Sequence, residues 1–190
     1  MSGTSKGQEQ WLAAGQELLR RGGVGAVRLQ ALTEELGLTT GSFYHHFSGM
    51  AEYLEQLAAY YGSDQPRSQL ALVEDADPRV RLERLIALAG DERMVPLDAA
   101  MRDWAGSNEA AARAVRDADA YLLRFIERAF LDLGYGRREA QTRATLLFSA
   151  GVARISPPWR LGNKVFDEVL DILAPVADPA PERPVRSRRR

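Results

Sequence analysis

Residues 27–47, VRLQALTEELGLTTGSFYHHF, contain two short helical segments joined by a glycine turn. Apolar side chains recur at helical spacing in the first segment, and Gly37 ends it because glycine readily adopts positive φ. Thr39 offers a hydroxyl that can cap the second segment. Phe43 and Phe47 lie four residues apart on that segment and therefore share one face. Two helices this short, linked in this way, predict a helix-turn-helix.

The second segment presents polar side chains on the face opposite its two phenylalanines. Hydroxyl and imidazole groups can reach base edges or phosphates, and a glycine allows the backbone to approach a DNA groove closely. The outward-facing residues are Thr39, Thr40, Gly41, Ser42, Tyr44, His45 and His46. Adjacent histidines on a helix diverge by about 100°, and no third ligand is nearby, so a metal site at His45 and His46 is disfavoured.

The run GSFYHHF at 41–47, preceded by LTEELGLTT at 32–40, resembles the recognition helix of TetR-family regulators. Over residues 22–54 the likeness covers the glycine spacing, the turn and the helix together. It implies phosphate contacts by Tyr44 and His46. It also implies base or phosphate contacts by Thr39, Thr40, Ser42 and His45.

Three positions depart from the pattern of that family. Arg28 stands where the family often has threonine, and it could still contact phosphate. Thr33 stands where alanine is common. Met50 replaces a lysine at the start of the fourth helix, which removes a phosphate contact. Residues 1–62 also carry fewer basic than acidic side chains, so a TetR-like dimer that has lost DNA affinity stays open as an alternative.

The rest of the chain has apolar residues at helical spacing and no strand-type alternation, which predicts an all-α protein. About nine helices are expected: 8–21, one on each side of Gly37, one from about 49, two starting near 78 and 96, and three at 108–133, 137–155 and 162–174. Residues 1–62 form the predicted helix-turn-helix head with the start of a connecting helix. Residues 63–175 form a ligand-binding and dimerisation domain. The basic, proline-rich tail at 176–190 is predicted to be disordered.

The body resembles the family more loosely, through AAMRDWA at 99–105 and RATLLFSAG at 143–151. The resemblance implies that the last two long helices form a four-helix bundle with those of a second copy. Small residues on one face of 137–155 permit such close packing. The predicted dimer interface is Ala140, Ala144, Leu147, Gly151, Val165, Val169, Ile172 and Leu173.

The resemblance also implies a ligand pocket between the head and the bundle. Its predicted lining consists of large apolar side chains, each of which could instead be plain core. These are Met101, Trp104, Tyr121, Phe125 and Phe148. Arg102 could meet an acidic ligand, although a salt bridge at the edge of the core is the alternative.

Composition excludes several classes of protein. The chain has no cysteine, so disulfides and thiolate metal sites are excluded, and the first 20 residues lack a secretory apolar region. No apolar run is long enough to span a membrane, which predicts a cytoplasmic protein. No nucleophile elbow, phosphate loop or metal-ligand set occurs, so an enzyme, a metal and a cofactor are not expected. The predicted function is transcriptional repression by a homodimer that binds a palindromic double-stranded DNA operator and is released by a small-molecule effector.

Overall fold

The computed structural model describes residues 5–63, 70–71, 74, 76–89, 93–155 and 163–175. Within these ranges the chain forms nine α-helices and one 3-10 turn, and no strand. They are α1 (Lys6–Gly22), η1 (Val24–Ala26), α2 (Leu29–Leu36), α3 (Thr40–His46), α4 (Met50–Ser63), α6 (Pro78–Ala89), α7 (Met94–Ala105), α8 (Glu109–Asp132), α9 (Arg137–Ile155) and α10 (Asn163–Leu173). The predicted all-α fold is confirmed. The predicted tail at 176–190 lies outside the described residues.

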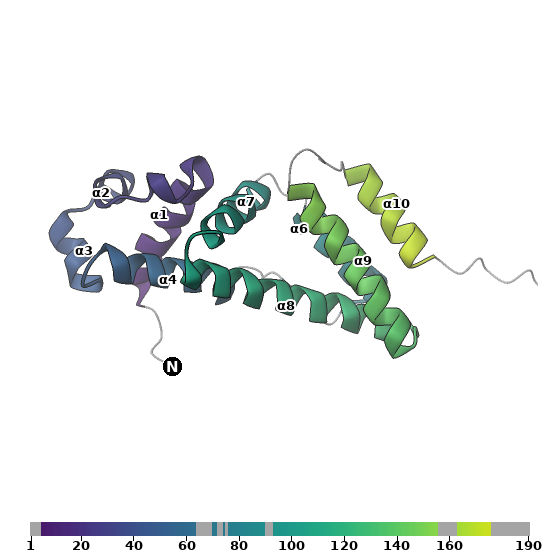
Figure 1. Ribbon diagram of the computed structural model, residues 1–190. Helices are drawn as coiled ribbons and strands as arrows, with labels where there is room; N and C mark the ends of the chain where they lie inside the picture. The colour runs from purple at the N-terminus through teal and green to yellow at the C-terminus, as the bar shows by residue number, and fades with distance from the viewer. Residues whose placement is uncertain are drawn as a thin grey trace, which may run out of the picture.

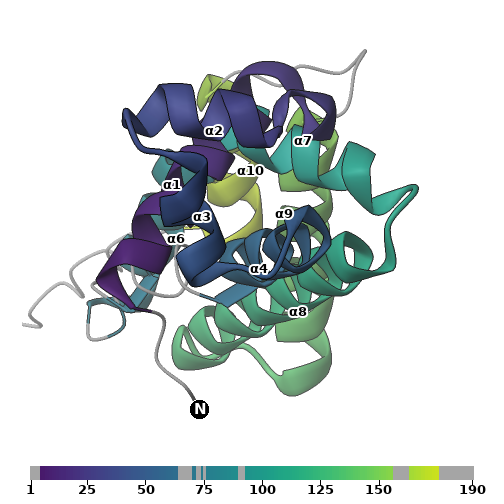
Figure 2. The same ribbon diagram turned by 90° about the vertical axis from the view of Figure 1, so that its left-hand side faces the viewer.

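The helices run from a small head at one end of the molecule to a helical body at the other (Figure 1). α1, α2 and α3 make up the head, and α4 leads from it into the body, where it packs along α8. α9 and α10 lie at the end opposite the head. Figure 2 looks onto the head, where α2 and α3 lie in front of the body helices.

Caps fix the ends of the longest helix. The Asn108 side chain accepts a hydrogen bond from the Ala111 amide at 3.0 Å and thereby satisfies one free N–H of the first turn of α8. Gly134 follows the helix with φ of +94°, a conformation that L side chains rarely adopt. α8 therefore has defined ends and contacts α4 and α7 near the head and α9 beyond them.

Two apolar cores hold these helices together. The first contains the head aromatics Trp11, Phe43 and Phe47 and continues without a break into Met101 and Trp104 of α7. The second joins α6, the far half of α8, α9 and α10. Since the first core extends from the head into the body, the head is packed against α7 and α8 and does not hang on a free linker.

Candidate nucleic-acid interface and interhelical cavity

α3 is anchored by two phenylalanines that are buried in the first core. The Phe43 ring meets the edge of Trp11, with ring centroids 5.4 Å apart. Phe47 meets Tyr53 of α4 at 5.0 Å in the same edge-on manner. Aromatic pairs of this geometry add to the stabilisation that burial provides. The inward face of α3 is thus fixed against both α1 and α4.

The turn before α3 has the glycine-dependent geometry that the sequence predicts. Gly37 has φ of +64° and ψ of +28°, and the Leu38 amide donates to the Thr33 carbonyl at 3.1 Å. This pairing is a Schellman motif, which closes the end of α2. Thr39 then caps α3, because its hydroxyl oxygen accepts from the Ser42 amide at 3.3 Å. The angle between α2 and α3 follows from these local bonds.

The outward face of α3 carries the polar residues that the sequence assigns to DNA contact. Tyr44 is 58% exposed, a high value for an aromatic side chain. Thr39, Thr40, Gly41 and His45 are also exposed, and Ser42 is half-buried. These exposed residues all belong to α3 or its N-cap, and α3 lies in the head at the end of the molecule (Figure 2).

Two of the predicted contact residues also make contacts within the head. His46 is half-buried, and a Cβ placed on Gly7 of α1 would lie 2.9 Å from its ring. Arg28 is exposed, and its Nε donates to the Gly25 carbonyl at 2.9 Å. These contacts orient both side chains before any ligand arrives. Sequence spacing gave no signal for the contact with Gly7, because 39 positions separate it from His46.

The start of α4 differs from the family pattern in charge. Met50 is half-buried and packs against the first core. Glu52 accepts hydrogen bonds from the Ser48 hydroxyl and, at 2.7 Å, from the Ser48 amide, and these bonds lower the pKa of its carboxyl group. The negative charge of Glu52 thus stabilises the first turn of α4. Met50 itself brings no positive charge to the start of α4.

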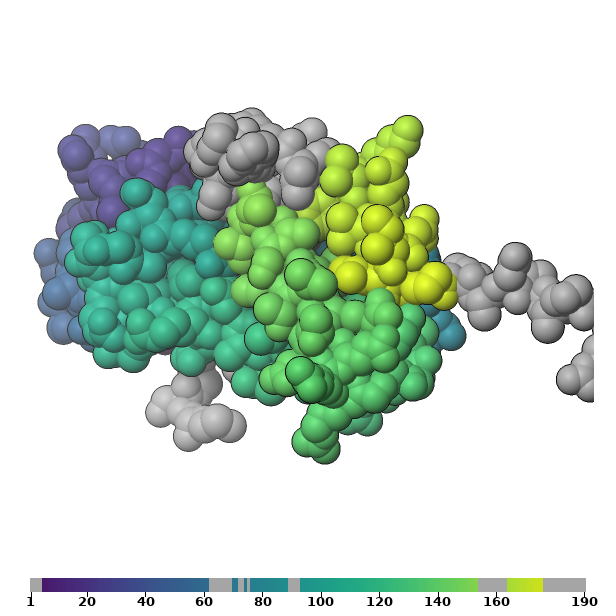
Figure 3. All heavy atoms as spheres, turned by 45° about the vertical axis from the view of Figure 1, so that its right-hand side comes forward, coloured from purple at the N-terminus to yellow at the C-terminus, as the bar shows by residue number. Residues whose placement is uncertain are grey.

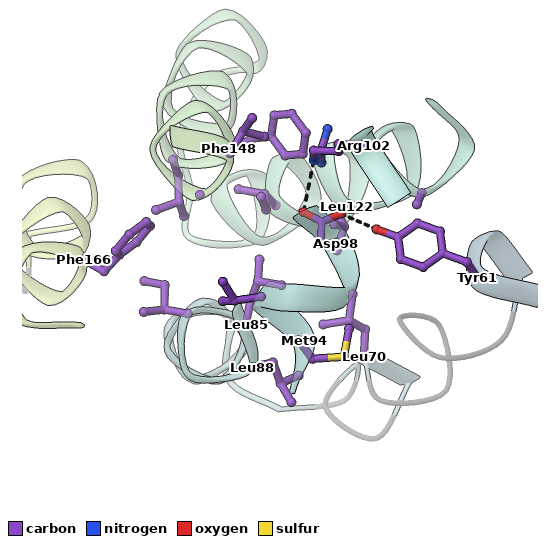
Figure 4. A pocket seen from close by; sticks show the side chains of 17 residues that line it. Tyr61, Leu70, Leu85, Leu88, Met94, Asp98, Arg102, Leu122, Phe148 and Phe166 are labelled. Carbon is purple, nitrogen blue, oxygen red and sulfur yellow. Dashed lines mark hydrogen bonds and ion pairs between the residues drawn. The ribbon is translucent and has the colours of Figure 1, made fainter. Parts of the chain in front are cut away.

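A cavity of about 150 Å³ lies deeper in the molecule, between the helices of the body (Figure 4). Its wall is mostly aliphatic and aromatic. The described lining residues are Tyr61, Leu70, Leu85, Ile86, Leu88, Met94, Val95, Asp98, Arg102, Ala118, Leu122, Ile126, Leu147, Phe148, Gly151, Val152 and Phe166. Residues from α4, α6, α7, α8, α9 and α10 contribute to it.

Of the five residues predicted to line a pocket, only Phe148 lines this cavity. Met101 and Trp104 are buried in the first core, and Tyr121 and Phe125 are not part of the wall. The prediction is corrected for these four residues. The reason is helix phase, because a neighbouring residue on a helix points about 100° away. Arg102 faces the cavity where Met101 does not, and Leu122 faces it where Tyr121 does not.

One end of the cavity carries a polar network (Figure 4). Asp98 accepts hydrogen bonds from the Tyr61 hydroxyl and, at 3.1 Å, from Arg102 Nε. The two terminal nitrogens of Arg102 donate to the carboxylate of Asp119 at 3.0 and 2.6 Å. The network thereby ties the end of α4 to α7 and α8. The salt-bridge interpretation of Arg102 agrees with this arrangement.

The same network shifts the pKa values of Tyr61 and Arg102. Burial raises the pKa of Tyr61 well above its usual value, and the negative charge of Asp98 raises it further. Burial alone would lower the pKa of Arg102, but the bonds to Asp119 and Asp98 outweigh it and raise the pKa. Tyr61 is therefore a neutral donor and Arg102 a fixed cation at physiological pH.

Four residues of the predicted dimer interface belong to the protomer's own interior. Ala140, Ala144, Leu147 and Leu173 are all buried in the second core. The small side chains of α9 do permit close helix packing, but the neighbouring helices lie within the same chain. The interface prediction is wrong for these four. Of the others, Gly151 lines the cavity, Val169 packs against the second core, and Val165 and Ile172 are exposed.

Apolar side chains remain exposed on the outer sides of α9 and α10. Leu146 is 54% exposed and Ile172 is 74% exposed, and Val165 is exposed as well. Figure 3 shows the two helices side by side on the surface. We name Leu146, Val165 and Ile172 the apolar end face. Leu146 was not among the residues predicted to form the interface.

Membrane-spanning helices and metal-binding clusters are both absent from the described residues. No described helix is long and apolar enough to cross a membrane. In the same part of the chain, no group of three or more histidine and acidic side chains is placed to hold a metal ion.

The head matches a known family in sequence. Residues 12–57 match the profile of the bacterial regulatory proteins, tetR family. This match confirms the resemblance drawn from residues 41–47. Members of that family are transcription factors and not enzymes, which agrees with the predicted non-enzymatic chain. No curated protein matches the chain in sequence.

Solved structures match over nearly the whole chain. A transcriptional regulator from Rhodococcus sp. Rha1 is similar with a TM-score of 0.69 and 21% identity, over 90% of this chain and 94% of that chain. A TetR-family regulator from Agrobacterium tumefaciens is similar with a TM-score of 0.69 and 17% identity, over 90% of this chain and 97% of that chain. At such low identity the likeness establishes the fold, a helix-turn-helix head on an all-helical body.

Proposed function

We propose that this chain, which has the head sequence and the fold of TetR-family transcriptional regulators, represses transcription as a homodimer bound to a palindromic operator. A small molecule in the cavity releases the DNA. The observation that carries the proposal is the outward face of α3, where polar side chains are exposed opposite a rigid aromatic anchor. Rigid placement of base-reading side chains is what sequence-specific binding requires.

The apolar end face supports the dimer. Leu146, Val165 and Ile172 lie on helices at the end opposite the head, so pairing there leaves both α3 helices exposed. A two-fold dimer can then place its recognition helices in successive major grooves, about 34–36 Å apart. Operator binding by both heads at once requires this dimer.

The position of α4 supports release by an effector. α4 begins four residues after α3 ends, and its Tyr61 reaches the polar end of the cavity. A ligand there can favour a different position of α4 and thereby of α3. It weakens DNA binding only if it binds better to a dimer whose heads do not fit successive grooves.

Operator binding is tested first with the purified protein and DNA from upstream of its own gene. Tyr44→Phe is expected to weaken binding about fivefold, because one hydrogen bond to a charged phosphate is lost, a cost of about 1 kcal/mol. Fluorescence anisotropy with labelled DNA measures the change. Tyr135→Phe, in the turn between α8 and α9, serves as the matched control and should bind as the parent does. Equal affinity for Tyr44→Phe would remove Tyr44 from the DNA contacts.

A dimer that binds an effector but not DNA is the second candidate. It is favoured by Met50, which packs inward where a lysine would contact phosphate, and by the acidic balance of residues 1–62. The two candidates differ in whether the protein retards the upstream DNA fragment in a gel-shift assay. A DNA-free regulator would leave the upstream fragment unretarded at every salt concentration, whereas an operator-binding dimer retards it.

Met50→Lys is expected to tighten DNA binding severalfold and to steepen its salt dependence by about one phosphate contact per head. The lysine stem can occupy the half-buried site of Met50 while the ammonium reaches outward. Titrations at several salt concentrations give the slope. Ala59→Lys adds the same charge to an exposed position further along α4 and should change the slope less. An unchanged slope for Met50→Lys would show that the start of α4 does not reach the backbone of the operator.

A further inference from the structure

The charges around the polar end of the cavity do not balance. Asp98 and Asp119 contribute two carboxylates, and Arg102 contributes one guanidinium. These three are also the charged groups that influence the pKa of the buried Tyr61 hydroxyl. The remaining described wall of the cavity is uncharged. The described groups at this end of the cavity thus carry one net negative charge beside an apolar wall.

The carboxylate of Asp98 keeps hydrogen-bonding capacity at this end of the cavity. Arg102 uses three of its five N–H groups here, Nε toward Asp98 and one on each terminal nitrogen toward Asp119, so its positive charge is already paired with carboxylates. Asp98 accepts from two donors, whereas a carboxylate offers about four lone-pair positions. Its side chain is only 15% exposed, so a charge that approaches it is poorly screened by water. A ligand that donates a hydrogen bond fits this end better than one that accepts.

We propose that the cavity selects a small lipophilic ammonium compound, with its apolar body against the aliphatic wall and its N–H group donated to Asp98. The inference rests on the proposed function, because it names the chemical class of the effector. A volume of about 150 Å³ suits a body of about one ring, since apolar cavities of that size hold benzene. A carboxylate ligand would meet the excess negative charge and is disfavoured.

The bound ammonium group would also act on α4. Asp98 holds the Tyr61 hydroxyl through the same carboxylate that receives the ligand (Figure 4). A third donor at that carboxylate weakens the bond to Tyr61, because the negative charge of Asp98 is then shared with the ligand, and this loosens the link between α4 and α7. Asp98 would thus contact both the ammonium group of the ligand and Tyr61 of α4, the helix that leads from the head.

Three probes of similar shape test the charge selection: benzylammonium, benzyl alcohol and benzoate. Ligand-observed NMR titration of the full chain without DNA measures binding of each. Benzylammonium is expected to bind at least about tenfold more tightly than either of the others, as one charge-assisted hydrogen bond in a poorly screened site provides. Equal binding of the alcohol, tighter binding of benzoate, or no binding of benzylammonium would overturn the inference.

Asp98→Asn tests whether the preference for the ammonium probe depends on Asp98. It should reduce benzylammonium binding about tenfold or more, leave benzyl alcohol within about twofold, and allow benzoate to bind more tightly, because Arg102 then lies in a locally neutral site. Asp103→Asn, an exposed position on the same helix, is the matched control and should change none of the three. The comparison of probes on the parent chain tests the inference even if Asp98→Asn folds poorly.

Adding operator DNA separates this inference from the function on which it rests. If benzylammonium binds selectively but leaves the DNA complex intact, the charge selection stands and the proposed release fails. If an uncharged probe binds better and releases DNA, the proposed release stands and the charge selection is overturned.

Discussion

Gly15→Ala is expected to destabilise the protein by about 2 kcal/mol and to lower Tm by about 4–8 °C. A Cβ at Gly15 would lie 2.0 Å from the Tyr53 hydroxyl oxygen and 3.1 Å from the Leu57 methyl groups. Both side chains are fully buried, and the Tyr53 hydroxyl donates to the Trp11 carbonyl at 2.8 Å. The overlap therefore costs more than the gain of about 1 kcal/mol in helix propensity.

Gly7→Ala is the matched control for this substitution on the same helix. A Cβ there would lie 2.9 Å from the half-buried ring of His46, which can turn away. Thermal denaturation followed by circular dichroism should find its Tm at or slightly above that of the parent. If Gly15→Ala were as stable as Gly7→Ala, the close approach of α1 to α4 would be refuted.

Features that depend on local chemistry were predictable from the sequence. Gly37 and Thr39 identify the turn and the start of α3, because positive φ and a capping hydroxyl are properties of single residues. Asn108 likewise caps α8, within a residue of the predicted start. The helix-turn-helix and the all-α fold follow from such signals.

The partners of each apolar face were not predictable in the same way. Helical periodicity shows that Ala144 and Leu147 share a face, but it does not distinguish packing within a chain from packing between two copies. Large aromatic residues were also poor guides to the cavity. Trp104 is buried in the first core, whereas the cavity is lined mainly by aliphatic side chains such as Leu85 and Leu122.

The spacing of residues in the sequence could not predict which side chains meet at the polar end of the cavity. Tyr61 and Asp98 are 37 positions apart and meet only because α4 and α7 both pack along α8. The sequence offered one signal, the position of Arg102 beside an apolar face. Its neighbours Asp98 and Asp119 lie four and 17 positions away, so only the first was accessible from helical spacing.

Leu146→Glu is expected to convert the proposed dimer to a monomer and to reduce operator affinity at least about a hundredfold. Leu146 is 54% exposed on the apolar end face, so a glutamate there should leave the folded protomer intact. In a dimer, the two-fold axis brings one charge from each protomer into the same apolar seam, at a cost of several kcal/mol. Loss of the dimer separates the two heads and removes the benefit of binding both half-sites.

Leu131→Glu is the control, since Leu131 is an exposed leucine near the end of α8 and is not part of the apolar end face. Light scattering and anisotropy should find it dimeric and able to bind the operator. A dimeric Leu146→Glu variant would refute the interface on α9 and α10. A monomeric variant that kept the operator affinity of the parent would instead show that one head binds the DNA by itself. Since operator binding with two-fold symmetry needs both heads, the two losses should occur together.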